Sequence, residues 1–210
     1  MSGEVDNPFF AGLWTRMSKR EPEAIRVLRR ENLEGLTGRV LEVGAGTGTN
    51  FPFYPSTVTE VVAVEPERRL AEIAARAAER APVAVTVTTD TIESYAPGER
   101  FDAVVCSLVL CSVGDPDEVL RQLFERLRPG GELRYLEHVA SDGLRSGLQR
   151  AADATVWPRL LGNCHTHRHT ERSIAAAGFV VDESRHEWVL PKWVPMPVGE
   201  TAIGRAVRPA

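Results

Sequence analysis

Short valine-rich runs separated by helical patterns are the feature that most constrains how this chain can fold. Five runs are predicted to be strands: residues 39–43, 59–65, 83–88, 101–109 and 132–139. Several are apolar on both faces, which is typical of buried parallel strands. Helical patterns cover residues 66–81 and 115–127 between them. Such alternation predicts a doubly wound α/β sheet with helices on both faces and right-handed crossovers.

The remaining segments complete this sheet. Pro66 stands at the favoured first position of the first helix, and Pro129 and Gly130 follow the second. Further helices are expected over 144–161 and 170–179, and further strands over 180–190 and 202–209. The last two strands can form an antiparallel hairpin at the sheet edge. The expected fold is therefore a Rossmann-like, mostly parallel, seven-stranded sheet.

Residues 1–38 look helical and separate in character from the domain expected over 39–210. Five apolar side chains fall on roughly one helical face: Phe9, Phe10, Leu13, Trp14 and Met17. Two interpretations remain open. The segment either packs on the sheet as an ordinary helix or forms a lid over a ligand.

Composition limits the possible partners and compartment. The 210 residues are 43% hydrophobic, which suits one domain with a sizeable core. A net charge of −4 without long like-charge runs argues against a nucleic-acid partner. The apolar stretches are too short to span a membrane. Three cysteines without C-x-x-C spacing favour a reducing cytoplasm over a disulfide framework. The oligomeric state stays undetermined.

A glycine-rich turn follows the first predicted strand, in VLEVGAGTGTNFPFYP. Gly44, Gly46 and Gly48 allow a sharp turn and a close approach of backbone N–H groups to a ligand. A dinucleotide fingerprint would need glycine where this chain has Thr49, and a phosphate-binding P-loop would need a lysine that does not follow. What remains is the pattern Glu42-x-Gly-x-Gly-x-Gly.

This pattern resembles motif I of the class I S-adenosylmethionine (SAM) methyltransferases. The segments VVAVEPE, FDAVVCSLVLCSV, LRPGGELRYLEHV and CHTHRHT extend the resemblance over nearly the whole chain. Together they resemble the thiol methyltransferase-like branch near the ubiquinone and menaquinone C-methyltransferases. The resemblance implies SAM as cofactor and S-adenosylhomocysteine as product. SAM has no phosphate, so a backbone-lined turn with carboxylates suffices where a basic cradle would have no purpose.

The expected cofactor contacts lie at the strand ends. Glu65 ends the second strand and is placed to accept hydrogen bonds from both ribose hydroxyls. The resemblance implies that Asp90 and the next backbone N–H groups face the adenine. Glu42 either contacts the amino-acid end of SAM or orients the loop. The full expected set is Glu42, Gly44, Gly46, Gly48, Asn50, Glu65, Pro66, Asp90, Thr91, Ile92, Ser107 and Leu108.

Methyl transfer from a sulfonium is an in-line displacement, so the protein mainly positions the acceptor and excludes water. A thiol acceptor, with a pKa of about 8.5, benefits from a nearby base or positive charge. His138 at the end of the fifth strand, with His165 and Arg168 in CHTHRHT, are the expected catalytic residues. Each could equally have a structural role. The expected pocket residues are Cys111, Cys164 and Trp14.

The CHTHRHT segment also raises the question of a metal. Extended backbone would place His165, His167 and His169 on one side, near Cys164. The spacing matches no recognised four-ligand site, so no metal is expected. The resembling family carries the residues that match Cys164, His165, Arg168 and Thr170, whereas His167 and His169 depart from it. Thr201 likewise stands where that family often has histidine.

The expected function is therefore SAM-dependent methylation of a small, fairly apolar acceptor, with a thiol as first expectation. Two alternatives stay open. One is C- or N-methylation of a quinone, lipid or natural-product scaffold, which would need a general base. The other is a SAM-binding protein without turnover.

Overall fold

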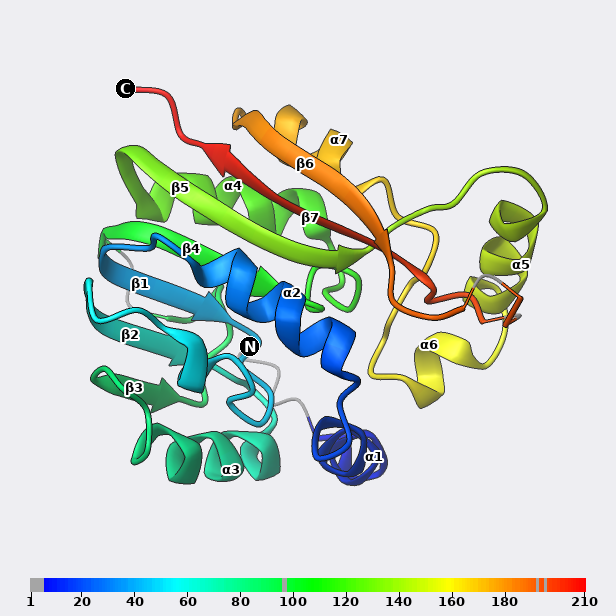
Figure 1. Cartoon of the computed structure of the whole chain (residues 1–210), viewed down its shortest axis with the longest axis horizontal. Coiled ribbons are helices and arrows are strands. Elements are labelled where there is room, and N and C mark those ends of the chain that lie inside the picture. Colours follow the sequence, from blue (N-terminus) through cyan, green and yellow to red (C-terminus); the bar gives the residue numbers. More distant parts are fainter. Residues whose placement is uncertain (1–5, 96–97, 192, 195) are drawn as a thin grey trace.

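A computed structural model describes residues 6–210 except 96, 97, 192 and 195. Its centre is one seven-stranded sheet in the order β3-β2-β1-β4-β5-β7-β6 (Figure 1). The strands are β1 (Gly38–Val43), β2 (Val58–Val64), β3 (Val85–Thr88), β4 (Phe101–Ser107), β5 (Leu127–His138), β6 (Val180–Trp188) and β7 (Glu200–Val207). The first five are parallel, and β7 runs antiparallel to both β5 and β6. The predicted doubly wound sheet with an antiparallel edge hairpin is confirmed.

Helices cover both faces of the sheet because the strands are apolar on both faces. The helices are α1 (Pro8–Ser18), α2 (Glu23–Leu33), α3 (Arg68–Ala78), α4 (Pro116–Arg126), α5 (Gly143–Asp153), α6 (Trp157–Leu160) and α7 (Thr170–Ala176). Successive residues of β1 belong to different hydrophobic clusters: Val40 to the cluster that contains Leu33 of α2, and Leu41 to the one that contains Leu120 of α4. Figure 1 shows α2 in front of the sheet and α4 behind it.

Helix boundaries differ from two sequence expectations. Pro66 does not occupy the first helical position, because Glu67 is extended and its carboxylate caps α3 by accepting the Leu70 N–H. The predicted helix over 144–161 is two helices, α5 and the short α6. The helix expected over 115–127 is confirmed as α4, and at its start the Asp115 carboxylate accepts two backbone N–H groups, with Pro116 as the first helical residue.

The N-terminal helices differ in how firmly they are held. In α2, four residues are buried, including Arg29 at 2% exposure. In α1 only Ala11 is buried, while Phe9 is 61% exposed. Within the described residues no helix is long and apolar enough to cross a membrane.

Candidate functional site

The carboxyl ends of the parallel strands form the candidate site. The sheet order reverses between β1 and β4, since β1 continues to β2 on one side and pairs with β4 on the other. Ligands of doubly wound folds bind at such a reversal point. The glycine turn after β1, Glu65 after β2 and Leu108 after β4 all lie at this edge.

Two glycines of the turn are required by their surroundings. Gly44 has φ +64°, and a Cβ there would collide with the side chain of Val109. Gly46 has φ +57°, and a Cβ there would lie 2.8 Å from Nε1 of Trp14. Trp14 therefore covers the glycine turn, where the cofactor is expected to bind. This tryptophan, expected in the acceptor pocket, is brought to Gly46 instead.

Glu65 lies directly beside the glycine turn. Its Oε2 accepts the Gly46 N–H at 2.7 Å and its Oε1 accepts the Glu67 N–H at 3.0 Å. Burial raises the pKa of Glu65, and these backbone hydrogen bonds oppose that shift. An ionised carboxylate offers about four acceptor positions, so acceptor capacity remains for two ligand hydroxyls.

Glu42 is the centre of a buried polar network beneath the turn. Tyr54 donates its hydroxyl to Oε2 at 2.7 Å, and Asn50 donates its amide to Oε1 at 3.0 Å. Asn50 also donates to the Ser107 hydroxyl at 3.1 Å and accepts from Arg29 of α2 at 3.0 Å. Burial raises the pKa of Glu42 to about 7, against the hydrogen bond from Tyr54. The network ties α2, the turn and β4 together.

Leu108 has an unusual backbone for a residue with a side chain. Its φ is +59°, a left-handed conformation that costs about 1–2 kcal/mol in a non-glycine residue. Its N–H donates to Leu136 O at 2.7 Å, which holds the conformation. Strain of this kind concentrates at functional sites, and Leu108 was among the expected cofactor contacts.

Some polar groups of the segment after β3 already hydrogen-bond to one another. Asp90 accepts a hydrogen bond from the Thr88 hydroxyl, and the Thr91 N–H donates to Ser94 Oγ at 3.0 Å. The Ile92 side chain is buried in the core. Of the expected adenine contacts, the Thr91 N–H is therefore committed to Ser94, whereas Asp90 keeps a second carboxylate oxygen at this edge.

Glu137 is a site residue that the sequence reasoning missed. It is fully buried, and its carboxylate accepts the N–H groups of Val109 and Leu110 at 3.0 Å and that of Cys111 at 3.3 Å. Burial raises the pKa of Glu137, against these bonds. A carboxylate inside an apolar strand, in YLEHV, was the available signal. Glu137 fixes the loop that follows β4.

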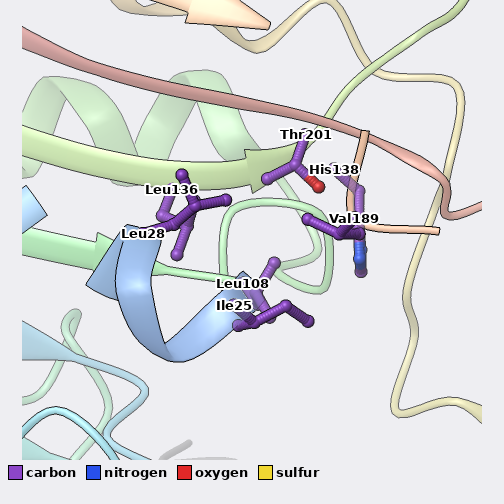
Figure 2. A pocket seen from close by; sticks show the side chains of 7 residues that line it. All are labelled: Ile25, Leu28, Leu108, Leu136, His138, Val189 and Thr201. Carbon is purple, nitrogen blue, oxygen red and sulfur yellow. The ribbon is translucent and has the colours of Figure 1, made fainter. Parts of the chain in front are cut away.

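A narrow opening lies beside His138. Figure 2 shows its lining side chains, which come from α2, the ends of β4 and β5, and the β6–β7 hairpin: Ile25, Leu28, Leu108, Leu136, His138, Val189 and Thr201. Its volume of about 10 Å³ is enough for about one water molecule. Thr201 pairs with His138 across the strands, and its buried hydroxyl has no hydrogen-bond partner among the described residues.

Cys111 and Cys164 are gathered around His138. The Cys164 sulfur lies 3.7 Å from His138 Nδ1, and one sulfur or nitrogen of each of the three lies within 4.8 Å of the others. Burial opposes protonation of His138, but contact with Cys111 and the charge of Glu137 raise its pKa overall. The expected pocket cysteines and the expected catalytic histidine therefore form one cluster.

The other two expected catalytic residues point elsewhere. Arg168 donates to the carbonyls of Leu110 and Val113, at 2.5 and 2.8 Å, and burial lowers the pKa of its guanidinium. His165 Nδ1 lies 4.0 Å from an Asp153 carboxylate oxygen. Arg168 therefore bears on the position of the loop after β4, His165 lies beside the end of α5, and neither lines the opening.

The histidines of CHTHRHT are not brought together with Cys164. His167 Nε2 is 2.8 Å from Ser146 Oγ, and the His167 and His169 rings meet edge to face at 5.4 Å between centroids. Extended backbone alone would have aligned them, but the chain turns into α7 directly after His169, which is the N-cap residue of that helix.

The cofactor edge fits the chemistry of SAM. Gly44, Gly46 and Gly48 leave the turn without a Cβ atom at every second residue, Glu65 keeps acceptor capacity for two hydroxyls, and no basic phosphate cradle is needed. The residues that would hold the amino-acid end and ribose are therefore those of the turn and Glu65, whereas Asn50 is buried and bonded to Arg29, Glu42 and Ser107.

Comparison with known proteins agrees with this geometry. Residues 14–183 match the family described as "Methyltransferase domain". Thiol S-methyltransferase TMT1B of Mus musculus is 34% identical over 96% of this chain and 85% of its own length. Ubiquinone biosynthesis O-methyltransferase of Proteus mirabilis (strain HI4320) is 30% identical over 50% of this chain and 44% of its own.

A solved structure shows the same fold. N-methyltransferase NodS from Bradyrhizobium japonicum WM9, in complex with S-adenosyl-L-homocysteine, superposes with a TM-score of 0.66 at 16% identity, covering 97% of this chain and 89% of NodS. The matched family and the near full-length relatives explain the glycine turn and Glu65 as parts of a SAM site. This chain belongs to the methyltransferase domain family and is a SAM-dependent methyltransferase.

Proposed function

We propose that this enzyme S-methylates a small, fairly apolar thiol. The observation that carries the proposal is the arrangement at the ends of β4 and β5, where apolar side chains surround a single imidazole, His138. The opening among them, about 10 Å³, must widen to admit the acceptor. A thiol needs little more than ionisation to become a nucleophile. The full-length similarity to a thiol S-methyltransferase supports the same acceptor class.

On the donor side, SAM supplies a methyl group on a positively charged sulfur. We propose that Glu65 accepts hydrogen bonds from its two ribose hydroxyls and that the Gly44–Gly48 turn holds its amino-acid end. Glu42 orients this turn through Asn50, since its own oxygens are committed to Asn50 and Tyr54. Asp90 is the proposed partner of the adenine.

On the acceptor side, we propose that a ring nitrogen of His138 takes the thiol proton. Ile25, Leu28 and Val189 keep water from the reacting sulfur. The Thr201 hydroxyl, buried and without a partner among the described residues, is the proposed polar contact for the acceptor. Arg168 and Glu137 act as positioning residues because they hold the loop from which Leu108 and Cys111 project.

We further propose that α1 within the N-terminal segment, residues 1–38, closes over the cofactor as a lid. Trp14 lies against Gly46, and Phe10, stacked on Trp14 at 5.9 Å, lies where a Cβ of Gly162 would be. The helix thus bridges the cofactor turn and the end of α6 with little buried surface of its own.

The lid is tested by the rate at which bound S-adenosylhomocysteine dissociates. Trp14→Ala is expected to speed dissociation several-fold, whereas Phe9→Ala, at an exposed position of the same helix, should leave the rate unchanged. Equal rates in both variants would contradict the lid and favour simple packing.

The proposal extends to partners and compartment. A small-molecule acceptor, rather than nucleic acid, suits a net charge of −4. Three free cysteines suit a reducing cytoplasm.

The deciding experiment measures S-adenosylhomocysteine formed from SAM, with mass detection of the methylated product. The acceptors are alkyl and aryl thiols, matched phenols and amines, and quinols. Turnover confined to thiols supports the proposal. Methylation of quinols but not thiols would favour the partial likeness to the ubiquinone O-methyltransferase, and SAM binding without any product would favour the non-catalytic alternative.

A further inference from the structure

Three soft side chains from three distant segments meet beside the acceptor opening. Cys111 follows β4, His138 ends β5, and Cys164 lies between α6 and α7. Their sulfur and nitrogen atoms lie within 4.8 Å of one another. Cys111 and Cys164 are 1% and 6% exposed, and both are free thiols. We call these three residues the Cys-His-Cys cluster.

The backbone around the cluster is firmly fixed. Glu137 accepts the N–H of Cys111 at 3.3 Å. The Cys111 carbonyl in turn accepts the His165 N–H at 2.7 Å, which joins the loop after β4 to the residue following Cys164. The two cysteines are therefore held in place by main-chain hydrogen bonds and not only by packing of their side chains, which is the preorganisation that a ligand site needs.

The ligand chemistry matches a soft or borderline metal ion. Zinc takes cysteine sulfur at about 2.3 Å and histidine nitrogen at about 2.0–2.1 Å, so two sulfurs of a tetrahedral site are about 3.8 Å apart. The observed separations need only a small contraction to reach this geometry. A divalent ion with two thiolates and one neutral imidazole has no net charge, which favours burial.

A buried donor lies beside the cluster. The Trp157 indole N–H contacts Cys164 and makes no hydrogen bond of normal geometry within the described residues. It can donate to a Cys164 sulfur that is bound to a metal ion.

We infer that Cys111, His138 and Cys164 bind one soft metal ion, with Zn²⁺ as the first candidate, and leave a fourth coordination position. Three protein ligands with an open position are the arrangement of catalytic rather than structural zinc sites. His138 belongs to both the cluster and the acceptor opening, so the ion would lie at the wall of that opening. The inference stands on the cluster geometry and does not depend on which acceptor is methylated. A neutral His138 bound to the ion through one ring nitrogen carries a proton on the other, so the proton transfer to His138 proposed above applies to the metal-free protein.

This site differs from the zinc site that the CHTHRHT segment suggested and the sequence argued against. That interpretation used neighbouring histidines along one segment. In the structure, His167 contacts Ser146 and His165 lies near Asp153. Of this segment, only Cys164 belongs to the cluster.

The test uses the full-length protein, stripped of metal under reducing conditions and titrated with Co²⁺ and with Zn²⁺. One Co²⁺ per chain should give the thiolate-to-cobalt charge-transfer absorption, and Zn²⁺ should displace it. Cys111→Ser and Cys164→Ser should each lower affinity by more than the roughly 10- to 100-fold lost when an outer partner of a ligand is removed. Cys106→Ala, which removes the third cysteine in the core of β4, should retain full binding.

Two results would overturn the inference. The first is a reduced wild-type protein that titrates three free thiols and gives no charge-transfer absorption with Co²⁺. The second is a mass lower by two hydrogens after exposure to air at saturating Zn²⁺, since a disulfide between Cys111 and Cys164 would then outcompete the metal. The wild-type spectrum decides the matter even where a serine variant fails to fold.

Discussion

The donor site and the acceptor opening differ in how far apart their residues lie in the sequence. At the donor end, Glu42, Gly46, Asn50 and Glu65 lie close in the sequence and bond to one another or to the adjoining backbone. The acceptor opening instead draws on α2, β4, β5 and the β6–β7 hairpin. A ligand site made by neighbouring residues can be identified from a motif, whereas one made by distant residues depends on the whole fold.

The largest effect is expected from Glu65→Ala. Loss of two charge-assisted hydrogen bonds, each worth about 1.5–3 kcal/mol, should weaken SAM binding by 100-fold or more. Isothermal titration with SAM and with S-adenosylhomocysteine measures this. Glu60→Gln, within the strand β2 that Glu65 follows, serves as the control. Unchanged affinity in Glu65→Ala would remove Glu65 from the donor site.

Glu42 should make stability depend on pH at the donor end. Its pKa of about 7 in the folded state exceeds the ordinary 4.5, so the folded state binds more protons between these values. The free energy of unfolding therefore falls as pH rises from about 4.5 to 7, by about 2–3 kcal/mol from this group. Urea unfolding across this range should show a flatter profile for Glu42→Gln. An identical slope in Glu42→Gln and in the exposed control Glu72→Gln would refute the assignment.

Arg168→Ala should impair acceptor binding without impairing SAM binding. Removing a guanidinium that donates to the Leu110 and Val113 carbonyls should cost about 2 kcal/mol of stability and raise the KM for the acceptor, with little change in SAM affinity. Denaturant titration and steady-state kinetics measure the two effects, with exposed Arg172→Ala as control. A change confined to SAM affinity would contradict this expectation.

The smallest effect is expected from Thr201→Val. The hydroxyl is buried without a partner among the described residues, so its loss should leave stability within about 1 kcal/mol of the wild type or slightly improve it. The acceptor KM should rise a few-fold while kcat stays constant. Thr201→Ser, which keeps the hydroxyl, should retain the wild-type KM. A KM that is the same in the wild type, Thr201→Val and Thr201→Ser would show that Thr201 does not contact the acceptor.

The sequence predicted the sheet well because its strands are apolar on both faces and its helices alternate with them. The donor residues were predictable for a related reason, since Glu42, the glycines and Glu65 form a motif over one strand-turn-strand unit. His138 and the two pocket cysteines were singled out, but their meeting was not foreseen. Their approach depends on where the chain between α6 and α7 crosses the sheet edge.

Other features had only weak signals. Glu137 looked like one more residue of a strand, and its role follows from the backbone N–H groups that the loop after β4 turns towards it. Ile25, Leu28 and Val189 read as ordinary apolar positions, because their place at the opening depends on long-range packing. The start of α3 was misplaced because the Glu67 cap competes with Pro66.

The antiparallel hairpin has a consequence for how such an enzyme can diversify. It supplies Val189 and Thr201 to one wall of the opening, yet it joins the sheet beyond β5, away from the glycine turn. Exchanging the connection between β6 and β7 for that of another member of the family could therefore redirect which molecule is modified while the methyl source stays the same. The hairpin is therefore a suitable segment to exchange in laboratory evolution of acceptor specificity.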